Sequence, residues 1–159
     1  IGACVKMIDD RQYAQSMETL AVLEGAATAL AAPNITPEQL ERARRTNEVM
    51  RGTLDDFNPR VFTVLNQEFH SALLTGCHNL RLTDLVHAEW AVLGNLREST
   101  FSFVPGRARE SVREHSAILE LIEQGAPPSE IERAVRAHRL ATMDAYLIRQ
   151  HDQASLDLD

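Results

Sequence analysis

The chain has 159 residues, enough for one domain with a substantial core, because a domain of this length buries about 70% of its unfolded surface. Its net charge of −7 opposes contact with a phosphate backbone, so we do not expect this portion of the protein to bind nucleic acid. No stretch approaches the roughly 18 uninterrupted apolar residues of a membrane span, and Cys4 and Cys77 lack the CxxC spacing of a thiolate zinc site. We therefore expect a cytoplasmic protein without a membrane partner or a disulfide framework.

Apolar periodicity and capping residues predict a chain of helices. Thr36 and Asn58 each precede a proline and are typical N-caps, Asn79 can cap the next helix, and Gly76 and Gly125 are expected at C-caps. We expect the helices at about residues 10–32, 37–52, 59–75, 79–96, 107–124 and 129–151, with a loop or short turn over 99–105 and a frayed end over 153–159. No segment requires a strand after the first few positions, so the predicted fold class is all-α, an antiparallel bundle of six or seven helices.

Four polar side chains fall on the apolar faces of three predicted helices: Asn66, His70, His115 and His138. Burying an unpartnered polar group costs about 1–3 kcal/mol, so histidines on core faces need partners. One such histidine alone is compatible with a hydrogen-bonded core residue, and an i,i+4 pair is common by chance. The set of three favours a shared metal ion, which would satisfy all the rings at once.

Neutral imidazole nitrogens suit borderline divalent ions, and a carbonyl oxygen adds a harder ligand. Three nitrogens and the Asn66 oxygen therefore predict a divalent transition metal, Zn, Ni, Fe or Mn, without selecting among them. Asn66 would ligate either directly or through a water, and it adds no negative charge to the ion. A small carboxylate, such as a hydroxy or keto acid, is therefore the expected effector. Arg97 could reach that carboxylate, or could instead pair with a neighbouring glutamate.

Three segments resemble a known family: NQEFHSALLTGCHNL (66–80), EHSAILELIEQG (114–125) and AVRAHRLATMDAYL (134–147). They are similar to the FCD ligand-binding domain of the FadR subfamily of GntR bacterial transcription regulators. In that family an aspartate is commoner at the place of Asn66, whereas the three histidines match by position. The opening residues IGACV resemble the end of a winged-helix wing. The resemblance implies a wing and linker remnant over residues 1–8 and an FCD-type effector-binding and dimerisation domain over residues 9–159.

The resemblance implies a regulator that forms a homodimer and binds operator DNA through a winged helix-turn-helix domain outside this chain, with the metal as a docking point for the effector. The alternative is a metal-dependent hydrolase or oxygenase in a helical bundle. Against the enzyme, no general base is evident, since Glu68 and Glu114 are expected to face away from the neighbouring ligand positions.

Overall fold

The computed structural model describes residues 9–96, 101 and 104–156, and these contain six α-helices and one 3-10 turn but no strand. The elements are α1 (Asp10–Ala31), η1 (Ala32–Asn34), α2 (Pro37–Gly52), α3 (Pro59–Leu74), α4 (Leu80–Leu96), α6 (Gly106–Glu123) and α7 (Pro128–Leu156). The prediction of an all-α bundle is confirmed. The expected wing remnant at residues 1–8 lies outside the described residues. No described helix combines the length and the apolar character that crossing a bilayer requires.

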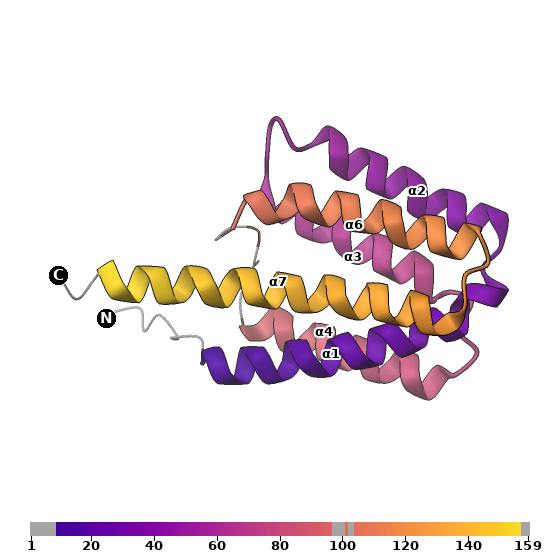
Figure 1. Ribbon diagram of the computed structural model, residues 1–159, viewed down its shortest axis with the longest axis horizontal. Coiled ribbons are helices and arrows are strands. Elements are labelled where there is room, and N and C mark those ends of the chain that lie inside the picture. Colours follow the sequence, from indigo (N-terminus) through magenta and orange to yellow (C-terminus); the bar gives the residue numbers. More distant parts are fainter. Residues whose placement is uncertain (1–8, 97–100, 102–103, 157–159) are drawn as a thin grey trace.

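The long helix α7 runs through the middle of the bundle (Figure 1). On one side of it lie α2, α3 and α6, and on the other side lie α1 and α4. The most extensive packing joins α7 to α1, and α2 packs mainly on α3. Helices α3 and α6 run in the same direction and α7 runs opposite to both (Figure 1). Side chains from α3, α6 and α7 can therefore meet at one level of the bundle.

The predicted helix starts are set by local hydrogen bonds. Thr36 and Gln39 form a reciprocal capping box at the start of α2. The side chain of Asn58 accepts from the first backbone N–H groups of α3, and the Asn79 side chain accepts from Leu82 at the start of α4. These contacts depend on residues close in sequence, which is why the sequence alone identified them.

The helix boundaries agree with the prediction at Gly125 and differ from it at Gly76 and at both ends of α7. Gly125 has φ +66°, the left-handed conformation expected of a glycine C-cap. Gly76 does not have a positive φ; instead, a Cβ there would lie 2.5 Å from the carbonyl oxygen of Ala31, so glycine allows the two segments to touch. Helix α7 begins at Pro128, one residue before the expected cap at Ser129, because proline suits the first helical position. The same helix continues to Leu156, beyond the predicted end.

The interior contains two apolar clusters. The first joins α2, α3, α6 and the start of α7, and includes Phe62, Phe69, Val112, Ile118, Ile131 and Val135. The second joins α1, α4 and the later part of α7, and includes Tyr13, Met17, Leu20, Val86, Met143 and Tyr146. His138 lies on α7 between Val135 of the first cluster and Met143 of the second. The polar side chains described next therefore occupy the junction of the two clusters.

Candidate metal centre

His70, His115 and His138 are brought together from α3, α6 and α7. All three side chains are buried, and each offers a ring nitrogen that lies within 4.8 Å of those of the other two. The Nε2 atoms of His70 and His138 are 3.2 Å apart. Phe69 stacks on His115, with ring centroids 3.9 Å apart and planes 12° from parallel, which fixes the tilt of that imidazole. The predicted convergence of the three histidines is present in the structure.

The outer nitrogen of His70 faces a buried carboxylate. Its Nδ1 lies 2.8 Å from Oε1 of Glu24 on α1, although the angle is poor for a hydrogen bond. Glu24 is 0% exposed and accepts two hydrogen bonds from Arg139, at 3.0 and 2.8 Å. The indole N–H of Trp90 on α4 donates to its Oε2 at 3.0 Å. Four helices thus meet at the Glu24 carboxylate.

The outer nitrogen of His138 faces a second carboxylate. Its Nδ1 lies 2.6 Å from Oε2 of Glu114 on α6. The guanidinium of Arg107 donates to both oxygens of Glu114, and its Nε donates to the hydroxyl of Thr142 at 3.1 Å. The side chain of Glu114 is 33% exposed, so this pair borders solvent.

The outer nitrogen of His115 faces a neutral acceptor. Its Nδ1 lies 3.0 Å from Oδ1 of Asn47 on α2. The amide nitrogen of Asn47 donates to the carbonyl of Val112 and to the hydroxyl of Ser116, so the amide oxygen is the atom turned toward the ring. The Nε2 of His115 is buried and has no hydrogen-bond partner among the described residues.

Electrostatics keep these rings neutral and their outer carboxylates charged. Burial lowers the pKa of His70 and of His115, and it lowers the pKa of His138 to about 3. Burial alone would raise the pKa of Glu114, but hydrogen bonds from His138 and Arg107 bring it to about 2. Burial opposes ionisation of Glu24 as well, yet the charge of Arg139 and the nearby His70 hold its pKa well below the usual value.

The three rings fit a metal ion. An ionised carboxylate or an amide oxygen can only accept, so these outer partners favour the tautomer with the proton on Nδ1 and the lone pair on Nε2. Two lone pairs that face each other at 3.2 Å repel unless a cation lies between them. For metal–nitrogen bonds of 2.0–2.1 Å, neighbouring ligand nitrogens are about 3.0–3.4 Å apart, which includes the 3.2 Å between the Nε2 atoms of His70 and His138. Outer carboxylates that hold ligating histidines are a common feature of metal sites.

Asn66, the fourth predicted ligand, lies one helical turn before His70 on α3. It is buried, and its Oδ1 has no hydrogen-bond partner within the described part of the chain. Arg97, the predicted effector contact, lies outside the described residues. Glu68 is exposed, as expected from its position on α3. Glu114 faces away from His115 as predicted, but it turns toward His138, a contact that the sequence analysis did not foresee.

The outer partners of the histidines were not predicted from the sequence, although Glu24 leaves a clear signal in it. The buried row on α1 recurs at alternating spacings of four and three residues, and a glutamate occupies one of its positions. The row consists of Tyr13, Met17, Leu20, Glu24, Ala27 and Ala31. A charged residue in an apolar row requires a buried partner. The partners Arg139 and Trp90 come from distant helices, so the sequence could raise the question but could not answer it.

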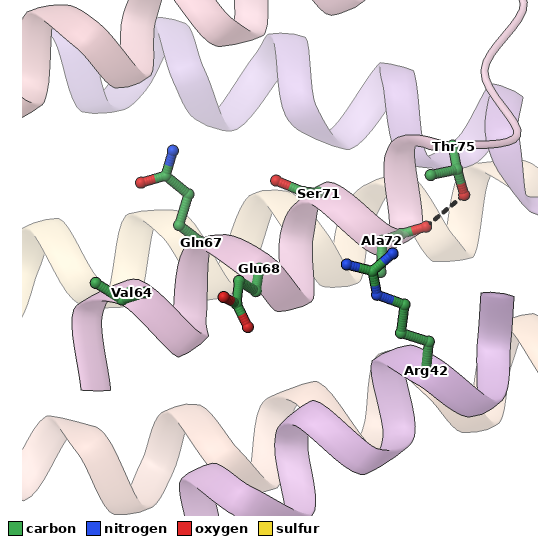
Figure 2. A pocket seen from close by; sticks show the side chains of 7 residues that line it. All are labelled: Arg42, Val64, Gln67, Glu68, Ser71, Ala72 and Thr75. Carbon is green, nitrogen blue, oxygen red and sulfur yellow. Dashed lines mark hydrogen bonds between the residues drawn. The ribbon is translucent and has the colours of Figure 1, made fainter. Parts of the chain in front are cut away.

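A surface hollow of about 370 Å³ lies apart from this cluster, between α2 and α3 (Figure 2). Arg42 reaches across it from α2, and the other lining residues are Val64, Gln67, Glu68, Ser71 and Ala72 of α3 and Thr75, the C-cap of that helix. None of the three histidines lines this hollow, and Val64, Gln67 and Glu68 are exposed. We assign no ligand to it.

Comparison with protein families decides the classification. The model of the FCD domain matches residues 15–142. The chain belongs to the FCD domain family. Its fold resembles the crystal structure of a transcriptional regulator, a GntR family member, from Pseudomonas syringae pv. tomato str. DC3000, with a TM-score of 0.71 and 23% sequence identity. The match covers 92% of this FCD chain and 60% of that structure. Among curated proteins, none matches the sequence.

Proposed function

We propose that this chain is the C-terminal effector-sensing domain of a GntR-family, FadR-subfamily transcription regulator, with a divalent transition metal as the effector's docking point. The observation that carries the proposal is the convergence of ring nitrogens from three buried histidines at the junction of two apolar clusters. Membership of the FCD family supports the regulatory role. Because the match covers only 60% of the neighbouring structure, DNA binding is assigned to a winged helix-turn-helix domain outside this chain.

The proposed ligands are His70, His115, His138 and Asn66. The histidines supply neutral nitrogens, and the Oδ1 of Asn66, which no described residue hydrogen-bonds, supplies a neutral oxygen, directly or through a water. When bound, Zn, Ni, Fe or Mn would provide a Lewis-acidic centre with positions left for another ligand. The outer partners keep each ring in the tautomer that such an ion needs.

The charges around the site support an anionic effector. Glu24 is paired with Arg139, and Glu114 is paired with Arg107, so each outer carboxylate is already offset by an arginine. Asn66 adds no charge, and a bound dication would therefore retain most of its positive charge. A small carboxylate suits this centre, because apolar residues of the first cluster, such as Phe69 stacked on His115, surround the histidines and favour a compact ligand over a long chain. Arg97 remains the proposed second contact for the carboxylate.

The geometry supports binding rather than catalysis. Both carboxylates next to the triad contact Nδ1 atoms, on the side of the rings opposite to the Nε2 atoms. Neither is placed to take a proton from a water held at the Nε2 side, as a hydrolytic site would require. The domain is therefore proposed to act without catalysis. Its output is a change in affinity for operator DNA, which requires the effector to bind the two states of a homodimer unequally.

Metal content gives the first test. Protein purified without chelator should contain about one equivalent of a divalent transition metal, measured by elemental analysis, and His115→Ala should lose it. His87→Ala is the matched control, because His87 is exposed and lies outside the triad. Metal retained in full by His115→Ala would contradict the site. Loss of metal from the His87→Ala control as well would point to a nonspecific effect.

The effector class is tested by thermal shift. A carboxylate that binds the metal-loaded protein should stabilise it by about 2.7 kcal/mol at a hundredfold excess over Kd. The same panel after chelation is the control, and the stabilisation should then disappear. Equal stabilisation of both forms would mean that the anion does not bind the metal. Stabilisation only by neutral sugars or long acyl thioesters would refute the proposed effector class.

The homodimer is tested by sedimentation of the purified chain at tens of micromolar. Two copies are expected to associate, because regulators that bind two-fold symmetric operators set the distance between half-sites through their dimer. A monomer at these concentrations would count against the proposed role in dimerisation.

A further inference from the structure

Glu24 occupies a singular place among the described acidic residues. Its carboxylate is fully buried and contacts three side chains from three other helices: His70 on α3, Trp90 on α4 and Arg139 on α7. The imidazole approaches Oε1, the indole approaches Oε2, and the guanidinium binds both oxygens. The carboxylate is therefore held in one orientation by groups that are themselves buried or half-buried.

The Glu24 carboxylate influences which nitrogen of His70 carries the proton. A carboxylate that only accepts keeps the proton of His70 on Nδ1 and leaves the lone pair on Nε2, 3.2 Å from the Nε2 of His138. Without an acceptor at Nδ1, the ring could place its proton on Nε2 and present no lone pair to an ion. Arg139 and Trp90 do not contact the Nε2 atoms, but they hold the carboxylate that orients the ring.

We propose that Glu24 is the positioning residue that makes His70 a metal ligand, and that Trp90 senses the occupancy of the site through Glu24. The inference rests on the proposed metal site. Helices α1 and α4 supply none of the proposed metal ligands, but through Glu24 and Trp90 they would orient His70 and respond to the bound metal. With an ion bound at Nε2, the Nδ1–H of His70 would be more acidic and would attract Oε1 of Glu24 more strongly, so the position of the charged carboxylate beside the indole would change.

Trp90 makes this sensing measurable, because the chain contains 1 tryptophan. Zn²⁺ is the appropriate probe, since its filled d shell has no redox chemistry and a change in emission then reports geometry and charge. Titration of the metal-free protein with Zn²⁺ should change the Trp90 emission until about one equivalent is bound. The change should be absent in His115→Ala. His87 requires its own control, since its ring lies 5.2 Å from the indole; His87→Ala should keep the response.

The positioning role is tested with a matched pair of double variants. Removing Glu24 alone would leave Arg139 as a buried unpaired charge and could unfold the protein, so Arg139→Met accompanies both changes. Glu24→Met with Arg139→Met removes the acceptor at His70, whereas Glu24→Gln with Arg139→Met keeps a neutral oxygen there. Both should fold, as judged by circular dichroism and the melting temperature of the metal-free form.

Zinc affinity, measured by competition with a chelator, separates the roles. The methionine variant should bind Zn²⁺ about 10–100-fold more weakly than the wild type, and the glutamine variant should recover most of that loss. A folded methionine variant with wild-type affinity would show that Glu24 is a structural ion-pair partner only. One equivalent of zinc bound by the wild type without a change in emission would refute the sensing role. A wild type that binds no zinc would refute the metal site itself, which is a different failure.

Discussion

Two carboxylate–histidine pairs flank the same cluster but differ in their surroundings. The enclosed pair, Glu24 and His70, lies among α1, α3, α4 and α7, and its carboxylate is 0% exposed. The open pair, Glu114 and His138, lies between α6 and α7, and its carboxylate side chain is 33% exposed. Each carboxylate is bound by a buried arginine. The difference indicates that one side of the cluster is fixed by packing, while water can reach the other.

Burial decides what the loss of each carboxylate costs. At the enclosed pair, water cannot reach the space of a removed carboxylate, so the charge of Arg139 and the Nδ1 of His70 would be left buried without a partner. At the open pair, water can approach the space beside Arg107 and compensate part of the loss. The enclosed pair should therefore govern stability, whereas the open pair is the side from which a metal or an effector could enter.

The largest expected effect is on the free energy of unfolding. Glu24→Gln should lower it by about 3–5 kcal/mol, because the change leaves a buried arginine without its counter-charge. Glu114→Gln should cost only about 1–2 kcal/mol, because its site is partly solvated. Urea denaturation with chelator present measures both. Adding Arg139→Met to Glu24→Gln should restore most of the stability, and equal losses for the two single variants would remove the distinction between the pairs.

Acid should destabilise the metal-free protein in two stages. The folded-state pKa of His138 is about 3, against a usual 6.5, so the unfolded chain binds the proton first and stability falls as the pH drops below about 6.5. Glu114 has a folded-state pKa of about 2, against a usual 4.5, so its contribution is present above 4.5 and is lost as the pH falls below that value. Glu24 is shifted in the same direction. Above about pH 7 these groups should leave stability unchanged.

The double variant Glu24→Gln with Arg139→Met separates the enclosed pair from the open pair in this profile. It removes one titrating carboxylate, so the loss of stability below pH 4.5 should be less steep by up to about 1.4 kcal/mol per pH unit. The loss between pH 6.5 and 4.5, which comes from the histidines, should remain. Urea denaturation over this pH range measures both regions, and an unaltered slope below pH 4.5 would show that Glu24 does not titrate on unfolding.

The contrast between the pairs also explains what the sequence could predict. Helix starts at Thr36 and Asn58 depend on atoms within three residues, and the burial of His70, His115 and His138 follows from helical periodicity. These features were predicted correctly because both depend on local spacing. The all-α bundle follows from the same spacing.

The outer partners depend on how distant helices cross. Glu114 does face away from His115, as its position on α6 requires, but the neighbouring α7 places His138 at that face. Leu30 on α1 is 53% exposed despite being apolar, because α1 turns the row that contains Glu24 toward Arg139. No local pattern encodes which arginine meets which glutamate across the bundle.

His115 provides a third comparison, because its outer acceptor is neutral. Asn47→Ala would leave the Nδ1 of His115 buried without the amide oxygen that it faces at 3.0 Å. We expect zinc affinity to fall about tenfold, the lower end of the effect of losing an outer-shell partner, since no charge is removed. Chelator competition measures the affinity. Thr46→Ala on the same helix is the matched control, because among the described residues the Thr46 hydroxyl donates only to the carbonyl oxygen of Arg42 in its own helix. If Asn47→Ala loses as much zinc affinity as the Glu24→Met, Arg139→Met double variant, the charge of the outer acceptor does not decide its contribution to metal binding.

The smallest expected effect concerns Asn66, which adds no charge to a cluster whose outer carboxylates are both offset by arginines. Asn66→Asp places a negative charge beside the ion, so metal should bind about tenfold more tightly, or by roughly 1.4 kcal/mol. The same charge should weaken the binding of carboxylate effectors, because it offsets part of the positive charge that attracts them.

Gln67→Glu is the matched control: it adds an equal charge to the same helix at an exposed position and should alter neither affinity. Chelator competition gives the metal affinity, and thermal shift with metal present gives the effector affinity. If Asn66→Asp behaves like Gln67→Glu in both measurements, Asn66 is not a ligand, and its Oδ1, which has no partner among the described residues, must serve another purpose.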